Sequence, residues 1–268
     1  MRKESKVFVQ SVNRIFDIIE LLSKEKNGLR LTDLSKILEL KSTTIHNLLG
    51  TVIHRGYITQ DTETMRYRLG YRCLLLAEKF TENDLLLSAA SDHLTALNKQ
   101  TDELVFLGII QKRDLICALK IESNRPLAVN PDQQWKNQFH STASGKILLA
   151  GLPPREAEAI MEKHGIIRFT ARTITRRDLL FEELQKVRQN LYAEARDESV
   201  EGISSLAVPI PGPAKPVLAA LAVALPSIRF TDERKEELLH LLHDTAEKIS
   251  MQLCAAGKNI SSGNSVNP

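Results

Sequence analysis

Hydrophobic residues recur at helical spacing in three segments near the start of the chain. The first segment is 10–24, and a short second segment has Thr32 as its predicted N-cap. After a tight break at 39–41, the third segment, 42–55, carries apolar residues at i, i+3, i+4, i+7 and i+8, and Gly56 follows it as a stop signal. The pattern therefore predicts three helices, the last two joined by a three-residue break.

A different pattern follows the third helix. A strand, a polar turn and a second strand are predicted over 57–70, and the resulting hairpin carries Arg66 and Arg68. A connecting helix is predicted over 73–80, and the polar residues 82–84 mark a natural domain boundary.

Helices and strands are mixed in the rest of the chain. The predicted helices are 85–100, 142–150, 155–163, 176–193 and 231–253, and the predicted strands are 103–110, 115–122, 204–210 and 216–224. Strands covered by helices indicate an α/β sensor-like layer and not a doubly wound nucleotide-binding fold. The fold class predicted for the whole chain is α+β. Its predicted divisions are a winged helix-turn-helix domain over 1–72, a linker helix over 73–84, a second domain over 85–256, and a disordered tail over 257–268.

The composition is that of a folded globular protein, with 43% hydrophobic and 26% charged residues. No apolar run approaches the ~18 residues needed to span a bilayer, and the polar start of the chain contains no signal-peptide core. Cys73, Cys117 and Cys254 are odd in number and far apart, so we interpret them as small hydrophobes in a reducing compartment. These observations predict a cytoplasmic protein without membrane contact.

Positive charge is concentrated at the front of the chain. Residues 1–72 contain 13 Lys and Arg against 8 Asp and Glu, whereas the rest of the chain contains 23 against 25. A basic front on a near-neutral body is typical of a polyanion-binding module joined to another domain. The asymmetry is modest, so it supports a nucleic-acid partner only in combination with the helix pattern.

The polar face of the third helix has the chemistry to read DNA. Two short helices joined by a tight break fit the geometry by which the second helix enters the major groove. Asn47 can pair with an adenine edge, threonines can contact phosphate, bases or a thymine methyl, and the hairpin arginines can act as a wing. The candidate DNA-binding residues are Thr32, Lys41, Ser42, Thr43, Thr44, His46, Asn47, Arg55, Arg66 and Arg68.

Two other interpretations of this region stay open. The helices could form a small bundle with a merely solvated polar face, or a winged helix used for dimerisation or protein contacts beside a small-molecule-binding domain. The preceding helix, the basic hairpin and the local positive charge favour sequence-specific DNA binding.

The chain resembles the IclR family of bacterial transcriptional regulators over nearly its whole length. The stretches that carry the resemblance are 31–34, 43–49, 56–58, 67–70, 140–146, 169–175 and 202–209. The resemblance implies a winged helix, a linker helix and a GAF-like C-terminal domain that binds a small effector. It also implies homodimers, often paired into tetramers, that bind palindromic double-stranded operators and act more often as repressors than as activators.

Two residues in the DNA-reading part depart from the family pattern. Glu39 stands where the family usually has glycine in the turn, and a non-glycine residue at positive φ costs about 1 kcal/mol, so we expect a slightly remodelled turn. Asn47 stands where the recognition helix usually carries arginine, which moves the expected specificity toward adenine.

The resemblance also places an effector site at the start of a helix. In the family, small carboxylates lie against backbone amides that correspond here to Ala143, Ser144 and Gly145. The N-terminus of a helix suits an anion because its first amides lack partners within the helix.

The side chains that complete this site differ from the family pattern. Carried over without a gap, the family's Asp is Ala195, its Cys is Ser205, and its two serines are Ala222 and Ala224. A hydroxylated ligand would leave polar groups unpaired here, at ~1–3 kcal/mol each. We therefore expect a more apolar organic acid as the effector. An empty, shrunken pocket or an alignment slip near 195 is the equal alternative.

Other arrangements of reactive side chains give little evidence for catalysis or metal binding. His140 and Ser141 with Asp132 could suggest a hydrolase triad, but no nucleophile-elbow motif is present. His240 and His243 lie three residues apart without an evident third metal ligand. We predict no catalytic residue, no metal site and no cofactor.

Overall fold

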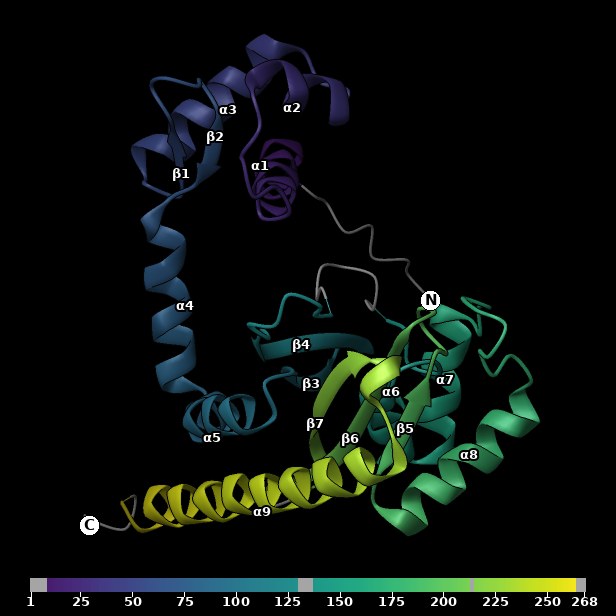
Figure 1. Ribbon diagram of the computed structural model, residues 1–268. Coiled ribbons are helices and arrows are strands. Elements are labelled where there is room, and N and C mark those ends of the chain that lie inside the picture. Colours follow the sequence, from purple (N-terminus) through teal and green to yellow (C-terminus); the bar gives the residue numbers. More distant parts are fainter. Residues whose placement is uncertain (1–8, 130–136, 213–214, 264–268) are drawn as a thin grey trace, which may run out of the picture. The chain divides into compact units, whose positions relative to one another are not determined.

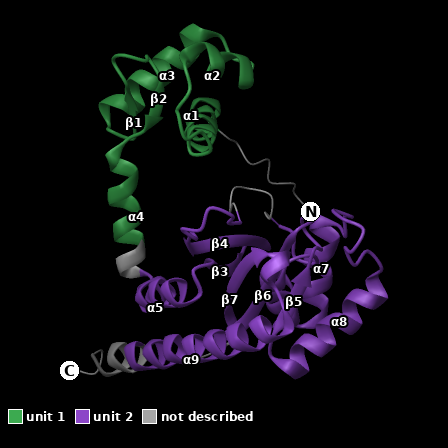
Figure 2. Cartoon of the chain, in the orientation of Figure 1, with its two compact units in different colours: residues 1–83 green, residues 84–268 purple. Residues whose placement is uncertain are grey.

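The chain folds into two compact units. The computed structural model describes residues 9–129, 137–212 and 215–263 (Figure 1). The first unit comprises residues 1–83 and the second residues 84–268 (Figure 2). Three features expected from the sequence lie outside the described residues: Asp132, positions 213–214 of the turn before the last strand, and the final tail segment 264–268.

The first unit contains a helix-turn-helix followed by a hairpin and a helix. Its elements are α1 Gln10–Leu22, α2 Leu31–Ile37, α3 Ser42–His54, β1 Ile58–Gln60, β2 Tyr67–Leu69 and α4 Tyr71–Asn83. β1 and β2 pair antiparallel, and Leu29 forms a bridge to Tyr67. Ile18, Leu34 and Ile45 are almost fully buried, and each such side chain stabilises the fold by about 1.5–3 kcal/mol.

The boundaries of α2 correct one sequence prediction and confirm another. The predicted N-cap Thr32 is wrong, because α2 begins at Leu31 and the residue before it, Arg30, takes the cap position. The Arg30 amide donates to Asp33 Oδ2 at 3.0 Å, so an acidic residue in the first turn closes the helix start. Glu39 has φ +53°, so the turn keeps its left-handed residue although that residue is not glycine.

The buried face of α1 also differs from the prediction. The apolar spacing over 10–24 predicts that Val12, Phe16 and Leu22 face inward. Leu22 is buried as predicted, but Val12 and Phe16 are exposed and Ile18 enters the core instead. This leaves an apolar strip on the outer face of α1.

The second unit is a five-stranded antiparallel sheet with helices on both faces. Its elements are α5 Leu85–Thr101, β3 Leu104–Gln111, β4 Asp114–Ile121, α6 Ala143–Ala150, α7 Pro154–His164, α8 Arg177–Asn190, β5 Ala193–Arg196, β6 Ile203–Gly212, β7 Lys215–Pro226, the 3-10 helix η1 Ser227–Arg229 and α9 Asp232–Gly263. The strand order is β4-β3-β7-β6-β5. The predicted α+β fold class is confirmed.

Each face of the sheet has its own hydrophobic core. Leu94 of α5 and Leu238 and Leu242 of α9 pack with one set of strand side chains. Ile147 of α6 packs with the other set, together with Leu184 of α8. Alternate residues of β7 therefore face opposite cores, as the period of two in a β-strand requires.

One strand of the second unit was not foreseen, and its last helix is longer than predicted. The strand β5 lies just after α8, in a place where the predicted helix was expected to run on to residue 193. The last helix, α9, continues to Gly263 and so covers the first part of the predicted disordered tail over 257–268.

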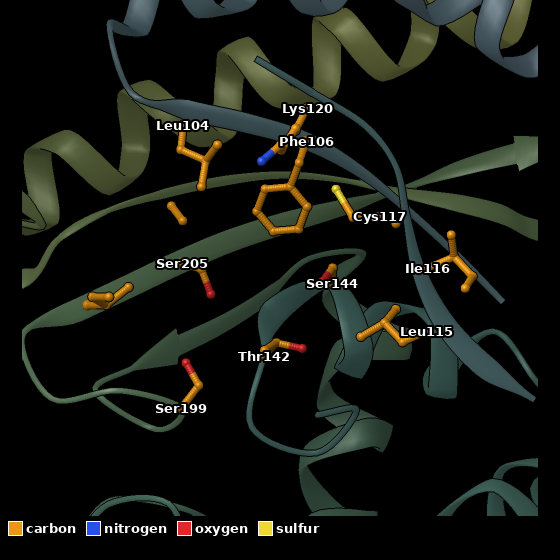
Figure 3. Close-up of a pocket in the computed structure, with 13 residues that line it drawn as sticks. Leu104, Phe106, Leu115, Ile116, Cys117, Lys120, Thr142, Ser144, Ser199 and Ser205 are labelled. Carbon is orange, nitrogen blue, oxygen red and sulfur yellow. The ribbon is translucent and has the colours of Figure 1, made fainter. Parts of the chain in front are cut away.

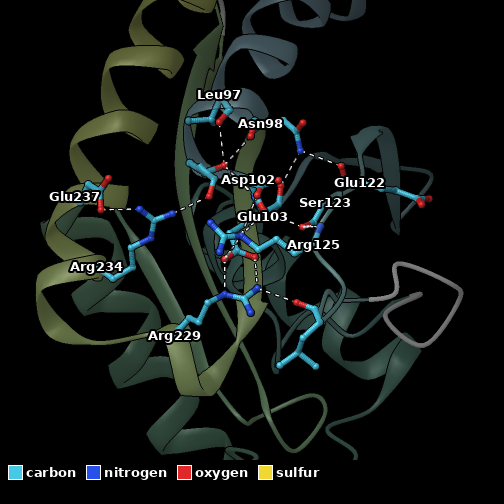
Figure 4. A network of polar contacts seen from close by, with 12 residues as sticks. Leu97, Asn98, Asp102, Glu103, Glu122, Ser123, Arg125, Arg229, Arg234 and Glu237 are labelled. Carbon is cyan, nitrogen blue, oxygen red and sulfur yellow. Dashed lines mark hydrogen bonds and ion pairs between the residues drawn. The ribbon is translucent and has the colours of Figure 1, made fainter.

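A buried carboxylate fixes the start of β3. Glu103 is 1% exposed and accepts two hydrogen bonds of 2.7 Å from Nε and Nη2 of Arg229 (Figure 4). Asn98 Nδ2 donates to the carbonyl of Glu103 at 2.8 Å and to that of Glu122 at 3.1 Å. This network joins α5, the start of β3, the end of β4 and the segment before α9, and it holds two strands that line a cavity.

Candidate functional sites

The outer face of α3 presents polar side chains. Thr43, His46 and Asn47 are exposed and Thr44 is half-buried, whereas Ile45 on the opposite face is fully buried. The helix therefore keeps its apolar face in the core and its polar face in solvent, which is the arrangement a recognition helix needs. Three further candidates, Thr32, Lys41 and Arg55, are exposed as well.

Hydrogen bonds within the turn set the start of α3. Ser35 Oγ donates to the Leu40 carbonyl at 2.6 Å, and the Leu40 amide donates to the Ser35 carbonyl at 3.2 Å. Ser42 Oγ donates to Ser35 Oγ at 3.3 Å. These bonds hold α3 against α2 without glycine in the turn, and they give the exposed Ser42 hydroxyl a partner within the unit.

The two hairpin arginines have different surroundings. Arg66 is half-buried, and its Nη1 donates to the Gly28 carbonyl at 2.8 Å. Arg68 is exposed on β2. Arg66 is therefore partly used to fasten the hairpin to the segment before α2, and Arg68 is the better placed for a phosphate.

A cavity of about 270 Å³ lies in the second unit, between the sheet and the start of α6 (Figure 3). Its walls come from β3, β4, β6, β7, the start of α6 and the loop after β5. The lining residues are Leu104, Phe106, Gly108, Leu115, Ile116, Cys117, Lys120, Thr142, Ser144, Ser199, Ile203, Ser205 and Ala224. The lining is mainly apolar with a few polar groups, the usual character of a small-molecule site.

The cavity includes only part of the predicted effector site. Ser144, Ser205 and Ala224 line it, whereas Ala143, Gly145, Ala195 and Ala222 are buried without lining it. Gly145 is needed for another reason: a Cβ there would lie 2.4 Å from the Phe139 carbonyl oxygen.

Strand register puts Ala195, Ala222 and Ala224 on one face of the sheet. Ala195 pairs with Ser205, Ser205 pairs with Ala224, and Ala224 pairs with Leu104, so these four residues form one row across the sheet. Paired residues of antiparallel strands share a face. Ala222 lies on the same face, one row further along β7, and pairs with Phe106.

Two of the three amides proposed for the carboxylate already have partners. The Ala143 amide donates to Ser205 Oγ at 3.4 Å, and the Gly145 amide donates to the N-cap oxygen Thr142 Oγ1 at 3.2 Å. Within the described part of the chain, neither the amide nor the hydroxyl of Ser144 has a hydrogen-bond partner, although Ser144 is 3% exposed. The start of α6 thus offers one uncommitted amide rather than three.

Sequence reasoning missed the β4 wall of the cavity. Phe106 pairs with Lys120, and Gly108 pairs with Cys117, because the register shifts between Leu107 and Gly108. This bulge lets Cys117 and Lys120, three positions apart, face the same side of the sheet. Alternation along 115–122 would have placed them on opposite faces, so the sequence held no signal for this pair.

A buried ion pair lies behind the cavity. Lys146 of α6 is 1% exposed, and its Nζ lies 2.6 Å from Glu198 Oε1, 2.9 Å from the Glu194 carbonyl and 3.4 Å from Glu183 Oε1. Burial raises the pKa of Glu198 to about 6, although the charge of Lys146 acts in the opposite direction. Glu198 directly precedes the lining residue Ser199, so the pair joins α6 to the loop that closes the cavity.

His140 has a packing role. Its ring is buried, its Nε2 lies 2.8 Å from the Ile167 carbonyl, and it stacks with Phe169 at a centroid distance of 5.7 Å. Burial lowers the pKa of His140, which favours the neutral ring.

Among the described residues, no group of three or more His, Cys, Asp or Glu could hold a metal ion. No helix in the described ranges is long and apolar enough to cross a membrane.

Comparisons with known proteins cover nearly the whole chain. Residues 11–62 match the family model described as the IclR helix-turn-helix domain, and residues 79–251 match the model of the bacterial transcriptional regulator IclR C-terminal domain. The chain is 32% identical over 245 residues to the HTH-type transcriptional regulator KdgR of Escherichia coli (strain K12), which covers 91% of this chain and 93% of KdgR.

Solved structures show the same fold. The crystal structure of Thermotoga maritima IclR matches with a TM-score of 0.76 and 24% identity, covering 91% of this chain and 98% of that one. An IclR homolog from Microbacterium hydrocarbonoxydans, crystallised with 4-hydroxybenzoate, matches with a TM-score of 0.77 and 20% identity, covering 91% and 99% of the two chains.

Proposed function

Because the chain belongs to the IclR family of bacterial transcriptional regulators, it is a DNA-binding regulator and not an enzyme, and we propose that it is a repressor whose operator binding responds to a small organic acid. The exposed polar face of α3, with Thr43, His46 and Asn47 above a buried apolar face, carries the proposal. Since its partner is DNA, the proposed location is the cytoplasm.

The proposed operator is palindromic and is bound by a homodimer, which can pair further into a tetramer. The supporting observation is apolar surface on the first unit: Phe16 on α1 and Leu74 and Phe80 on α4 are all more than half exposed. Large exposed apolar patches mark interaction surfaces in soluble proteins. Two identical subunits related by a two-fold axis match the symmetry of a palindrome.

The proposed effector occupies the cavity beside α6. An acid with a largely apolar body suits walls made by Phe106, Leu115 and Ile203. The 4-hydroxybenzoate bound to the Microbacterium homolog is a molecule of this kind, although that chain is only 20% identical.

Fluorescence anisotropy on DNA from the protein's own upstream region tests the proposed reading surface. Asn47→Ala should weaken operator binding by about 5- to 150-fold, which corresponds to the 1–3 kcal/mol of a good base contact. Arg68→Ala should weaken binding to every DNA sequence and reduce the salt dependence by about one phosphate contact.

Gln189→Ala is the matched control, because Gln189 is an exposed amide side chain on α8. It should leave operator affinity unchanged. Absence of any sequence-specific binding, or full operator binding after Thr43→Ala and Asn47→Ala together, would contradict the proposal and favour a winged helix that serves protein contacts.

A further inference from the structure

The polar groups of the cavity lie at its two ends. Figure 3 shows Lys120 on the β4 wall, and Ser144, Ser199 and Ser205 around the other end, with Phe106 between them. Among the described residues that line the cavity, Lys120 is the one with a charged side chain. The cavity therefore has a cationic end, an apolar middle and a hydroxyl-lined end.

At the cationic end, the Lys120 ammonium group can exchange its present partner, Glu122, for a ligand carboxylate. Lys120 Nζ lies 3.2 Å from Glu122 Oε1, and the two side chains are 38% and 59% exposed. An ion pair this exposed contributes little, typically less than about 1 kcal/mol, so a carboxylate inside the cavity can compete for the ammonium group.

The other end offers hydrogen bonds without charge. The amide and hydroxyl of Ser144 have no partner in the described structure, and neither has the hydroxyl of Ser199. Ser205 Oγ accepts from the Ala143 amide, which leaves its proton to donate. A neutral hydroxyl or carbonyl group fits this end, whereas a second carboxylate would lack a cation.

We infer that Lys120 anchors the effector's carboxylate, and that the ligand is a monoanionic acid with an apolar, preferably aromatic, middle and a neutral hydrogen-bonding group at its far end. This inference rests on the proposed function. It reverses the orientation that the family resemblance implies, in which the carboxylate lies against the amides at the start of α6. The carboxylate lies at β4, and the serines at the start of α6 bind the neutral end.

Isothermal titration of the full chain with three matched probes tests this orientation: 4-hydroxybenzoate, benzoate, and the uncharged 4-hydroxybenzamide. Lys120→Met should weaken binding of 4-hydroxybenzoate by about 10- to 100-fold, as expected for loss of a charge-assisted hydrogen bond, and leave 4-hydroxybenzamide within about twofold. Ser144→Ala should weaken 4-hydroxybenzoate more than benzoate. Lys186→Met, which removes an exposed lysine on α8, should change nothing.

Three results would overturn the inference. They are unchanged affinity of the Lys120→Met chain for 4-hydroxybenzoate, equal losses for the acid and the amide, and failure of both acids to bind the unaltered chain. Operator binding measured on the same samples distinguishes failure of this inference from failure of the proposed function. An operator response to the acids that is unchanged in the Lys120→Met chain would overturn the inference alone, whereas acid binding without operator binding would contradict the DNA-reading role.

Alkylation of Cys117 gives a second measurement that needs no effector. Cys117 lines the cavity with Lys120, and exposed Cys254 on α9 serves as an internal reference. A cation in the cavity should favour the anion iodoacetate over neutral iodoacetamide, so Lys120→Met should lower the ratio of the two rates at Cys117 severalfold and leave the ratio at Cys254 unchanged. Peptide mass spectrometry measures the two rates at each cysteine. A ratio at Cys117 that Lys120→Met leaves unaltered would show that Lys120 does not create the anion site.

Discussion

Gly145 and Gly50 both lie inside helices, but the space around them differs. A Cβ at Gly145 would lie 2.4 Å from the carbonyl oxygen and 2.5 Å from the Cα of Phe139, whereas nothing lies within 4 Å of the corresponding position at Gly50. The backbone of Phe139 cannot move away cheaply, because Phe139 is itself buried in the core beside α6.

The same substitution should therefore have opposite effects at the two glycines. Gly145→Ala should lower the free energy of unfolding by about 1–3 kcal/mol through overpacking. Gly50→Ala should raise it by about 0.5–1 kcal/mol, because alanine restricts the unfolded chain and meets no neighbour in α3. Urea denaturation followed by circular dichroism measures both. A Gly145→Ala chain as stable as the unaltered one would show that the α6 start can relax.

Single residues also mark where sequence reasoning reached its limit. The exposed position of Asn47 and the left-handed Glu39 follow from helix periodicity and turn geometry, which are local. The pairing of Arg66 with the Gly28 carbonyl, 38 residues away, is set by the tertiary fold and could not be read from the hairpin.

Among the elements, β3 depends on an ion pair formed by Glu103, the residue directly before the strand. Glu103 is 1% exposed and pairs with Arg229; within the described structure Arg125 also lies near it, with Nε 3.8 Å from Oε1. Arg229→Ala should cost about 3–5 kcal/mol of stability, because it leaves a buried carboxylate without its main partner. Arg176→Ala is the control, since it breaks the exposed pair with Asp178 and should cost less than about 1 kcal/mol. Thermal unfolding of the two variants checks the difference, and equal losses would contradict the role of burial.

The ion pair between α6 and the loop after β5 gives stability a pH dependence. Burial raises the pKa of Glu198 to about 6 from its ordinary 4.5, against the pull of Lys146, while Glu183 and Glu194 add to the rise. A raised pKa in the folded state means that protonation stabilises the fold. That contribution is fully present below pH 4.5 and is lost as the pH rises through about 6, and it amounts to about 2 kcal/mol.

Glu198→Gln removes this titration. The stability of the unaltered chain relative to the variant should fall by about 2 kcal/mol between pH 4.5 and pH 7, measured by urea denaturation at each pH. Glu201→Gln makes the same change of charge at an exposed position of the same loop and should not reproduce the fall. A difference between Glu198→Gln and the unaltered chain that stays constant over this range would contradict the assigned titration.

At the scale of elements, the sequence predicted most helices and strands but not how strands align. The periodic segments gave the positions of α3, β3, β4 and β6 because burial of one face imposes a fixed spacing. The bulge that brings Cys117 and Lys120 to one face depends on pairing between strands, and no periodic signal marks it. The predicted effector site therefore contained Ser144, Ser205 and Ala224 but lacked the whole β4 wall.

At the scale of the whole molecule, the two units differ in the surface that they leave apolar. Exposed large hydrophobic side chains gather on α4, where Tyr71, Leu74 and Leu75 are all more than half exposed, and on α1, where Phe16 is 56% exposed. In a lone subunit these side chains would face water at about 25 cal/mol per Å² of apolar surface. Covering them against a second copy supplies a driving force for the proposed dimer.

Charges placed on this surface should separate the subunits without unfolding them. Phe16→Glu combined with Leu74→Glu should convert the dimer to a monomer in sedimentation velocity, because each dimer would bury four carboxylates. Binding to a palindromic operator should fall to the affinity of a single half-site, since each head would bind alone. Ile228→Glu is the matched control: Ile228 is 82% exposed on η1 in the second unit, and its replacement should leave both assembly and operator affinity unchanged. A Phe16→Glu, Leu74→Glu chain that still sediments as a dimer would place the interface outside α1 and α4, and the second unit would then have to supply it.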